Sequence, residues 1–278
     1  MSNVTTKILA GIVPALMLAS CSGNSDNEKA LSLYAEAEEA IETNDFNGAL
    51  MLIDSINKAY PKAIDVRRKS MHLKARVNEG LALARLESAD SLAAVLQAEI
   101  DSMSTGLELI KNPVENYYVA KGVNPSKFIG TDGIQARMSP EGDLYLMSSL
   151  GSHKVESTSI TVGCNGEEAT TAVVNYDGER NDRSMGAEVI TFMGVECDSV
   201  ARFIADHAGE KMQLTFNGKT SYRMNLPEQM AEDIATLTRY AMKVRALKSA
   251  LVNKERQKKI LDTARSQAAR TYNEADEE

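Results

Sequence analysis

Two cysteines, Cys164 and Cys197, are the side chains in the second half of the chain with the greatest capacity for covalent chemistry. Outside the cytoplasm two such thiols can form a disulfide, and closing the long loop between them would contribute about 3–4 kcal/mol. The alternative, which we favour, is a pair of small buried hydrophobic residues. A nucleophilic role would need a base close to a thiol. Cys197 precedes a segment with helical periodicity, but the only histidine on that helix, His207, lies about 15 Å further along its axis.

The most polar stretch of the same region is residues 176–183, Tyr-Asp-Gly-Glu-Arg-Asn-Asp-Arg. One interpretation is a solvated loop in which arginines pair with carboxylates. The other is a recognition loop for a partner, since binding residues often lie on loops held by a rigid scaffold. The candidate recognition residues are Tyr176, Asp177, Glu179, Arg180, Asn181, Asp182 and Arg183.

A calcium loop is a weaker interpretation of these residues. Asp177, Glu179 and Asn181 occupy positions 1, 3 and 5 of the calcium-binding pattern, and Glu188 occupies position 12. Position 6 requires glycine but is Asp182, and strands rather than helices are expected on both sides. We therefore expect no metal ion at this loop.

Other patterns that carry chemistry are missing from the sequence. The chain has 3 Cys and 3 His, widely scattered, which predicts neither a zinc ribbon nor a histidine-rich site. Residues 130–133 are Gly-Thr-Asp-Gly without the Lys-Ser/Thr of a phosphate-binding loop, and no G-x-S-x-G or H-E-x-x-H spacing occurs. We predict no catalytic residue, no metal and no cofactor.

Composition narrows the classes of protein further. The 278 residues include 31 basic and 39 acidic ones, a formal net charge of −8, and aromatic residues make up 5% with no Trp. An acidic chain poor in aromatic residues is unsuited to phosphate-backbone contacts or base stacking, so nucleic acid is excluded as a partner. A hydrophobic fraction of 43% is enough for a core, and the length allows one large or two modest domains.

The N-terminus carries an export signal. Lys7 precedes an apolar run over residues 8–18 that is too short for a membrane span and has the length of the hydrophobic region of a signal peptide. The run ends in Leu18-Ala19-Ser20-Cys21, and there the chain resembles a bacterial lipoprotein precursor, whose lipobox is Leu-small-small-Cys. The resemblance implies cleavage before Cys21, a diacylglycerol thioether on its sulfur and acylation of the new amino terminus. An ordinary secretory peptide is the alternative.

The resemblance also implies a destination. In many Gram-negative lipoproteins an Asp directly after the lipidated Cys marks retention at the inner membrane, and Ser22 stands there instead. The outer membrane is therefore the expected location. We divide this region into a signal peptide (1–20) and a lipidated Cys with a polar tether (21–28). An acidic chain is repelled by anionic head groups, so the lipid must hold the protein at the membrane.

Residues 29–61 are expected to form a helical hairpin. Two stripes of period 3.6, over 28–43 and 46–60, are separated by Asn44 and Asp45. The segment resembles one tetratricopeptide repeat, with small residues at Ala37 and Ala49 and Pro61 at its end. Asn44 stands where glycine is usual in that family. No second copy follows, so a peptide-binding superhelix is not expected.

Two long helices are predicted over residues 62–112 and 226–271. The first shows the 4-3-4-3 spacing of a coiled coil through Leu96, Ile100, Met103, Leu107 and Ile110. The second begins after Asn225, a favourable N-cap, with Pro227 in its first turn. Similar lengths on either side of one insert suggest an antiparallel pair. A homo-oligomeric coiled coil is the alternative, and residues 272–278 are an acidic tail.

The insert, residues 113–225, alternates apolar and polar residues as strands do. Alternating positions include Ile134 with Ala136, Leu144 with Leu146, Ile160 with Val162, Ala172 with Val174, Val189 with Thr191, and Leu214 with Phe216. Asn-Gly pairs at 165–166 and 217–218 mark turns, the second being the sharper signal for a type I′ hairpin. A short helix is expected over 198–208. These elements predict a small antiparallel sandwich or barrel.

Together these features predict an α+β protein with no catalytic activity. It would be a lipid-anchored accessory protein of the cell envelope, with a structural role or one in binding an unidentified envelope protein. Binding of a glycan or peptidoglycan fragment by the β-domain is the alternative. In general architecture and in the loop 176–183 the chain is similar to lipoproteins of Gram-negative gut anaerobes, a resemblance that implies no particular activity.

Overall fold

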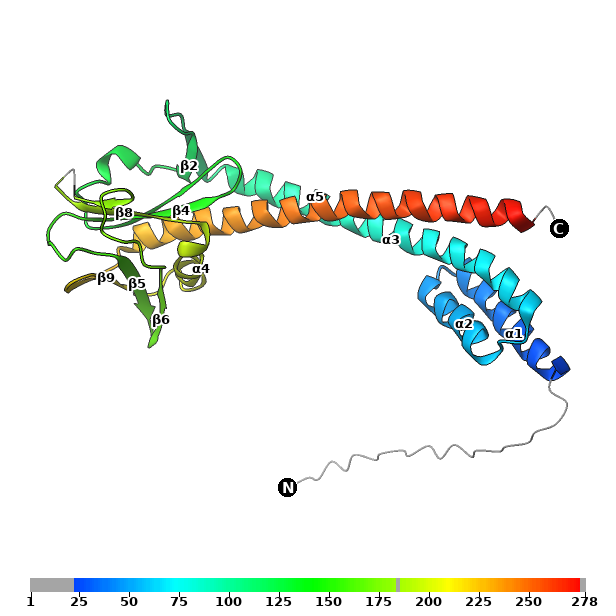
Figure 1. Ribbon diagram of the computed structural model, residues 1–278. Helices are drawn as coiled ribbons and strands as arrows, with labels where there is room; N and C mark the ends of the chain where they lie inside the picture. Colours follow the sequence, from blue (N-terminus) through cyan, green and yellow to red (C-terminus); the bar gives the residue numbers. More distant parts are fainter. Residues whose placement is uncertain (1–22, 184–185, 276–278) are drawn as a thin grey trace, which may run out of the picture. The chain divides into compact units, whose positions relative to one another are not determined.

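The computed structural model describes residues 23–183 and 186–275. The predicted signal peptide, Cys21 and the last three residues of the acidic tail lie outside this range. Over the described residues the protein is α+β, with five α-helices and two antiparallel sheets of six and four strands (Figure 1). The chain forms two compact units. Unit 1 contains residues up to 86 and from 257 onward, and unit 2 contains residues 87–256.

Unit 1 is helical. It contains α1 (Gly23–Glu42), α2 (Phe46–Ala59), the first part of α3 (Ile64–Ser104) and the last part of α5 (Glu228–Ala275). Helix α1 begins five residues before the predicted start at 28 and so takes in most of the segment that we predicted as a polar tether. Helices α1 and α2 pack on each other through Ala37 and Ala49, whose small, fully buried side chains allow a close approach.

The connection between α1 and α2 follows from two residues. Asn44 has a positive φ of 60°, a conformation that Asn tolerates better than most residues, which explains why it can replace glycine here. Asp45 caps α2 by accepting a hydrogen bond from the Gly48 amide at 2.9 Å. Phe46 then packs over Gly80 of α3, where an added Cβ would lie 2.3 Å from the ring.

The first long helix ends earlier than its apolar spacing predicts. Helix α3 stops at Ser104, and residues 107–110 form strand β1. The predicted helix over 62–112 is therefore wrong in its last turns, although Leu107 and Ile110 fit the coiled-coil rhythm. Gly106 interrupts the helix, and pairing of β1 with β2 (Tyr117–Ala120) satisfies the extended backbone instead. Helix α5 begins at Glu228, two residues after the predicted start at 226, and continues to Ala275, four residues beyond the predicted end at 271.

Helices α3 and α5 run antiparallel within each unit. In unit 2, Lys243 lies 2.6 Å from Glu99, Lys254 pairs with Asp90, and Ala250 packs on Ala93 and Leu96. In unit 1, Arg265 lies 3.2 Å from Glu79, and Leu261 and Ala264 pack on Ala82. Residue numbers rise in one helix as they fall in the other, as an antiparallel pair requires.

Unit 2 contains both sheets. The larger has the order β1-β2-β3-β4-β8-β7, with β3 at Gly133–Met138, β4 at Leu144–Leu150, β7 at Asn181–Asp182 and β8 at Glu188–Met193. The smaller has the order β10-β9-β5-β6, with β5 at Ser159–Cys164, β6 at Glu167–Thr170, β9 at Gln213–Asn217 and β10 at Ser221–Asn225. The insert thus begins at β1, a few residues before the predicted boundary at 113.

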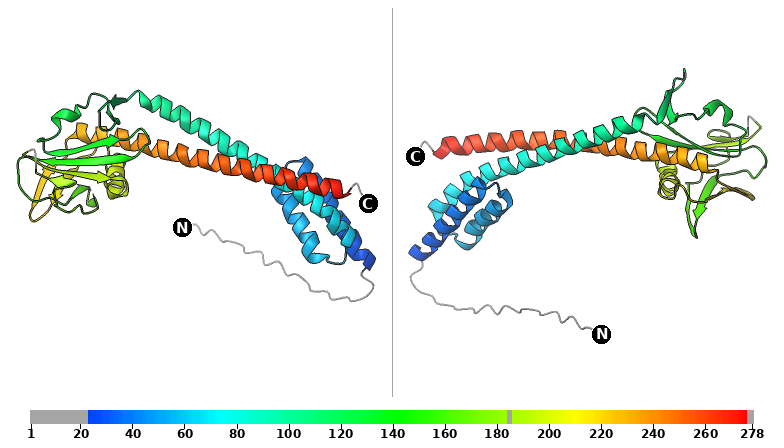
Figure 2. Two further views of the ribbon diagram at one scale, coloured as in Figure 1. Left: turned by 45° about the horizontal axis from the view of Figure 1, so that its top comes forward. Right: turned by 180° about the vertical axis from the view of Figure 1, so that it is seen from behind.

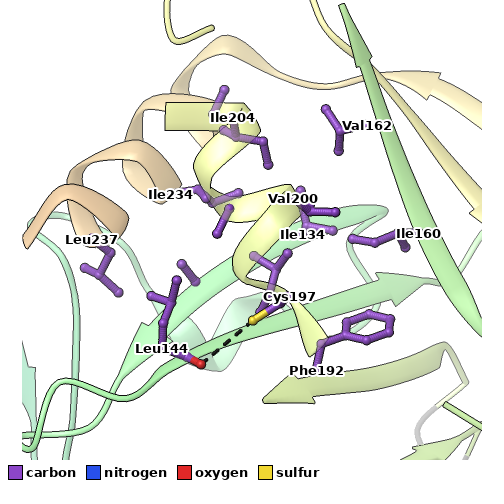
Figure 3. Close-up of a cluster of buried hydrophobic side chains, with 14 of the residues drawn as sticks. Ile134, Leu144, Ile160, Val162, Phe192, Cys197, Val200, Ile204, Ile234 and Leu237 are labelled. Atoms are coloured by element: carbon purple, nitrogen blue, oxygen red, sulfur yellow. Dashed lines mark hydrogen bonds between the residues drawn. The ribbon is translucent and has the colours of Figure 1, made fainter. Parts of the chain in front are cut away.

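The core of unit 2 lies between the sheets and is completed by two helices, α4 (Asp198–Asp206) and the first turns of α5 (Figure 2). Alternate residues of each strand point into it. Figure 3 shows side chains of both sheets meeting those of α4 and α5, among them Ile134, Leu144, Ile160, Val162, Phe192, Val200, Ile204, Ile234 and Leu237. Their burial supplies the main stabilising term of the fold.

Most of the predicted strands are confirmed, because their alternation reflects one buried face. The pair Ala172 and Val174 is an exception, since residues 171–175 form no strand and β6 ends at Thr170. Both predicted Asn-Gly turns are confirmed, but the positive φ values expected at the second turn occur at the first. Asn165 and Gly166 have φ values of 50° and 88° and form the two-residue loop between β5 and β6. The hairpin at 217–218 exists, but its loop has three residues and neither Asn217 nor Gly218 has a positive φ.

Candidate functional site

The predicted recognition loop, residues 176–183, is held by its own hydrogen bonds. Asp177 accepts a hydrogen bond from the Glu179 amide at 3.1 Å. Arg180 donates two hydrogen bonds to Glu196, at 2.8 and 3.0 Å, and this pairing holds the pKa of Glu196 below its usual range. The outer half of the loop therefore matches the interpretation as a polar loop with internal Arg–carboxylate pairs.

The inner half of the loop is structural. Asn181 is fully buried, and its amide donates to the carbonyl oxygens of Ser157 and Val174 at 2.7 and 2.9 Å. Arg183 donates to the carbonyl of His153 at 3.0 Å and lies 3.6 Å from Glu188. These contacts fix the loop on the neighbouring segment.

Glu188 is the buried anchor of this arrangement. Its side chain is fully covered, and its two oxygens accept hydrogen bonds from the amides of Val155, Glu156 and Ser157 at 2.9–3.0 Å. A buried carboxylate is tolerated when it is paired and hydrogen-bonded in this way. Glu188 and Asn181 therefore have structural partners and do not face a calcium position, which removes the calcium interpretation of the loop.

A groove of about 460 Å³ lies over the outer face of the six-stranded sheet. One wall is the connection between β1 and β2, and the other is the outer half of the loop 176–183. Its floor consists of outward side chains of β2, β3, β4 and β8. The lining residues are Asn112, Val114, Glu115, Tyr117, Arg137, Tyr145, Met147, Glu179, Arg180, Asp182, Val189, Thr191 and Met193. Three of the predicted recognition residues therefore belong to a concave site, whereas Tyr176, Asp177, Asn181 and Arg183 do not line it.

The floor of the groove combines charge with aromatic rings. The guanidinium of Arg137 lies 4.7 Å from the centre of the Tyr117 ring, a cation–π distance. Burial lowers the pKa of Arg137, although the group remains charged at any physiological pH. Tyr145 donates to Glu115 at 3.3 Å, and burial together with this carboxylate raises the pKa of its hydroxyl. An anionic or hydrogen-bonding ligand group can reach Arg137 from the open side.

The rim of the groove is apolar and accessible. Val114 is 93% exposed, and Met193 is 44% exposed. Met147 and Val189 extend this apolar surface along the floor. A site of this kind, with an apolar surface and a few convergent polar groups, is typical of ligand and peptide binding.

The two cysteines of unit 2 are both free and buried, so the disulfide alternative is not formed. Cys197 begins α4 in the core, with its sulfur 3.8 Å from the carbonyl of Leu144 (Figure 3). Burial raises the pKa of its thiol to about 12, the opposite of what a nucleophile needs. Cys164 ends β5, and its sulfur lies 3.6 Å from Glu210.

A serine, a histidine and an aspartate lie close together near residue 152. In a catalytic triad the aspartate would contact the histidine, but here it contacts the serine. The Ser152 hydroxyl contacts Asp132 and lies 2.6 Å from Nδ1 of His153. Asp132 also accepts hydrogen bonds from the Gly151 and Ser152 amides, at 2.8 and 3.0 Å. Burial opposes ionisation of Asp132, but these bonds hold its pKa below the usual range. The carboxylate therefore orients the serine and its backbone rather than the histidine.

Comparison of the chain with protein families, curated proteins and solved structures gave no significant match. Among the described residues, no helix combines the length and the apolar character needed to cross a membrane. The site must therefore be interpreted from its own geometry.

Sequence reasoning missed most of the groove and one polar cluster. The floor residues, such as Arg137 and Tyr145, are single outward positions of strands that look like ordinary solvent-facing residues. The cluster joins Cys164 to His207 and Glu210, although the scattered Cys and His residues of the sequence predict neither a zinc ribbon nor a histidine-rich site. A signal for it exists in the repeated spacing Cys-x-Gly-Glu at 164–167 and His-x-Gly-Glu at 207–210.

Proposed function

We propose that this protein is a lipid-anchored accessory protein of the cell envelope, attached to the outer membrane through Cys21, and that unit 2 binds a segment of another envelope protein. The observation that carries the proposal is the groove on the outer face of the six-stranded sheet. It offers an accessible apolar rim at Val114 and Met193 and a charged floor at Arg137. The role is structural or adaptor-like and needs no catalytic residue.

The chemistry of the floor favours a protein segment over a sugar. Sugars bind flat aromatic faces that are open to solvent. Tyr117 is only 9% exposed, and its ring is already in contact with the Arg137 guanidinium. The apolar rim suits an aliphatic side chain, and Arg137 suits a carboxylate of the same segment.

A glycan or peptidoglycan fragment is the second candidate. Tyr145 is partly exposed, and both signs of charge line the groove, which suits a short zwitterionic peptide attached to a sugar. Competition by such fragments distinguishes this ligand from a protein partner.

The finer architecture belongs to the same proposal. We take α1 and α2 to be a tetratricopeptide-like hairpin, the two sheets to be a sandwich, and α3 with α5 to be a coiled-coil-like pair. The small buried residues Ala37 and Ala49 support the first assignment, and the shared core of the sheets supports the second. A homo-oligomer formed through the long helices would bury the exposed positions Leu92, Val95 and Val252.

The experiment is site-specific photocrosslinking in intact cells. A photoreactive residue replaces Val114 at the groove, and a control replaces Val173, which is 69% exposed and does not line the groove. We expect a discrete adduct with one envelope protein from position 114 alone. The adduct should weaken in a Cys21→Ala form, which lacks the anchor.

Two results separate the candidates. Loss of the adduct when purified muropeptides are added would assign the groove to a peptidoglycan fragment. Identical adduct patterns from positions 114 and 173 would contradict a binding role for the groove.

A further inference from the structure

Four side chains with metal-binding atoms gather at two turns of unit 2, away from the groove lining. The ligand atoms of Cys164, His207 and Glu210 all lie within 4.8 Å of one another. A carboxylate oxygen of Glu167 lies 3.7 Å from Nε2 of His207. We propose that these four residues bind one Zn²⁺ ion, a second site that is independent of the proposed partner groove.

The two turns present their ligands in the same way. Cys164 ends β5 and Glu167 begins β6, while His207 ends α4 and Glu210 follows three residues later. In both turns a glycine with a positive φ, 88° at Gly166 and 89° at Gly209, directly precedes the glutamate. Two ligands separated by two residues in each of two turns is the arrangement by which many zinc sites are built.

Cys164, His207 and Glu210 lie near the spacing of tetrahedral ligands, and Glu167 lies beside His207. Bonds of about 2.3 Å to sulfur and 2.0–2.1 Å to nitrogen or oxygen place tetrahedral ligands about 3.3–3.5 Å apart. The sulfur of Cys164 is already 3.6 Å from an oxygen of Glu210. Glu167 and Glu210 are exposed, so their side chains can close the remaining gap without moving the backbone.

His207 is oriented as a metal ligand. Its Nδ1 lies 2.9 Å from the carbonyl oxygen of Phe203, which can only accept, so Nδ1 carries the proton. In the neutral ring the lone pair is then on Nε2, the nitrogen that lies 3.7 Å from Glu167. The ring also packs against Phe203, with 4.2 Å between centroids. Fixing of a metal-binding imidazole by a hydrogen bond from its other nitrogen is the usual outer-shell arrangement.

The other ligands are also supported by neighbouring groups. Asn165 donates a hydrogen bond to the carboxylate of Glu210, which limits its rotation. The buried thiol of Cys164 contacts the Lys211 carbonyl oxygen at 3.7 Å and lies at the edge of an open depression of about 450 Å³. The depression gives an ion an entry path from solvent.

The chemical type of the ligands selects the metal. A thiolate and an imidazole favour zinc and disfavour calcium and magnesium, which prefer oxygen ligands only. The two carboxylates make the cluster locally anionic, and a divalent cation offsets their mutual repulsion. On binding, Zn²⁺ displaces the thiol proton of Cys164 to solvent and forms the Zn–S bond.

Cobalt titration tests the proposal, because Co²⁺ occupies zinc sites and gives a charge-transfer absorption band only with a thiolate ligand. Every preparation is the full chain with Cys21→Ser, so that the N-terminal thiol does not contribute. We expect one Co²⁺ per chain, a thiolate-to-cobalt band, and its complete loss on addition of one equivalent of Zn²⁺. The Cys164→Ser variant should lose the band, and His207→Ala should weaken binding at least about tenfold.

Controls are taken from neighbouring positions. Glu168→Gln lies beside Glu167 but outside the cluster, and should leave affinity unchanged within about twofold, whereas Glu210→Gln should weaken it. Thermal unfolding without metal checks that each variant folds. If Cys164→Ser does not fold, the affinity of His207→Ala for the metal tests the site instead. The absence of saturable binding to the parent chain would overturn the proposal. Binding to Cys164→Ser and His207→Ala equal to that of the parent would also overturn it.

Discussion

The loop 176–183 and the paired turns 164–167 and 207–210 are both polar segments of unit 2, but their side chains find partners in different ways. In the loop, Arg180 pairs with Glu196, and Asn181 and Arg183 bond to backbone carbonyls. At the turns, a thiol, an imidazole and the carboxylate of Glu210 face one another, and the carboxylate of Glu167 lies beside the imidazole. The loop side chains bond mainly to a neighbouring carboxylate and to the backbone, whereas those at the turns bring metal-ligating atoms close to one another.

This difference separates polar clusters that stabilise the fold from polar clusters that can bind a ligand. Buried polar groups with complete partners stabilise a particular backbone path, as Glu188 does by accepting three amide hydrogen bonds. Acceptors and metal-binding atoms that face each other with few donors between them indicate a ligand.

The largest effect is expected at the buried anchor of the loop. Glu188→Ala leaves three buried amides without an acceptor and removes the carboxylate beside Arg183, so the free energy of unfolding should fall by about 3–5 kcal/mol. Denaturant unfolding followed by circular dichroism measures it. The exposed neighbour Glu179→Ala is the control and should change stability by no more than about 0.5 kcal/mol. Equal effects at the two positions would contradict a structural role for Glu188.

At the paired turns we expect bound Zn²⁺ to raise the free energy of unfolding. Zn²⁺ that binds only the folded protein, at a free concentration one hundred times its Kd, should add about 2.7 kcal/mol to the free energy of unfolding. Thermal unfolding with zinc and with a chelator measures this gain. His207→Ala should abolish most of it, whereas Ser152→Ala, in another polar cluster of unit 2, should retain it. A zinc-independent Tm for the parent chain would count against the site.

Two glycines compare the regions directly. Gly166 and Gly178 have φ values of 88° and 87°, and an added Cβ at either position would meet nothing within 4 Å. Alanine at either position should therefore cost a similar amount, about 1 kcal/mol, through backbone strain alone. Only Gly166→Ala should also weaken zinc binding, because it distorts the turn that holds Cys164 and Glu167. Equal zinc affinity in the two variants would show that this turn does not position the ligands.

The smallest effect concerns pH. The pKa of Glu196 is lowered in the folded state by its hydrogen bonds from Arg180. The resulting stability is fully present above the unfolded pKa of about 4.3 and is lost as pH falls through the lower folded value. Arg180→Ala should therefore reduce stability slightly at pH 7, since the pair is partly exposed to solvent, and should not change it at a pH below both pKa values. A larger loss at pH 2 than at pH 7 would contradict this sign.

The regular elements of unit 2 could largely be predicted from the sequence. Alternation such as that of Ile134 and Ala136 reflects a strand with one face in the core, and this pattern is local. The end of α3 could not be predicted, because Leu107 and Ile110 fit a helical rhythm until pairing with β2 is known. Tertiary hydrogen bonding overrides local spacing there.

The sites were harder to predict than the elements. A polar composition predicts that a loop is exposed, but Asn181 is buried because distant carbonyls of Ser157 and Val174 accept its hydrogens. The zinc ligands come from two turns that are far apart in the chain and meet only through the packing of α4 on β5 and β6. In both cases the groups that give a side chain its role belong to a distant segment. Residue spacing within one segment does not reveal them.

X-ray absorption at the zinc edge of the zinc-loaded protein identifies and counts the ligand atoms of the ion. It is therefore the sharpest test of the proposed zinc site at the two turns. We predict one sulfur at about 2.3 Å and three nitrogen or oxygen ligands at about 2.0–2.1 Å. The sulfur contribution should disappear in the Cys164→Ser variant and persist in Cys197→Ala. A first shell without sulfur in the parent protein would contradict the site and, with it, the distinction drawn between the two polar segments.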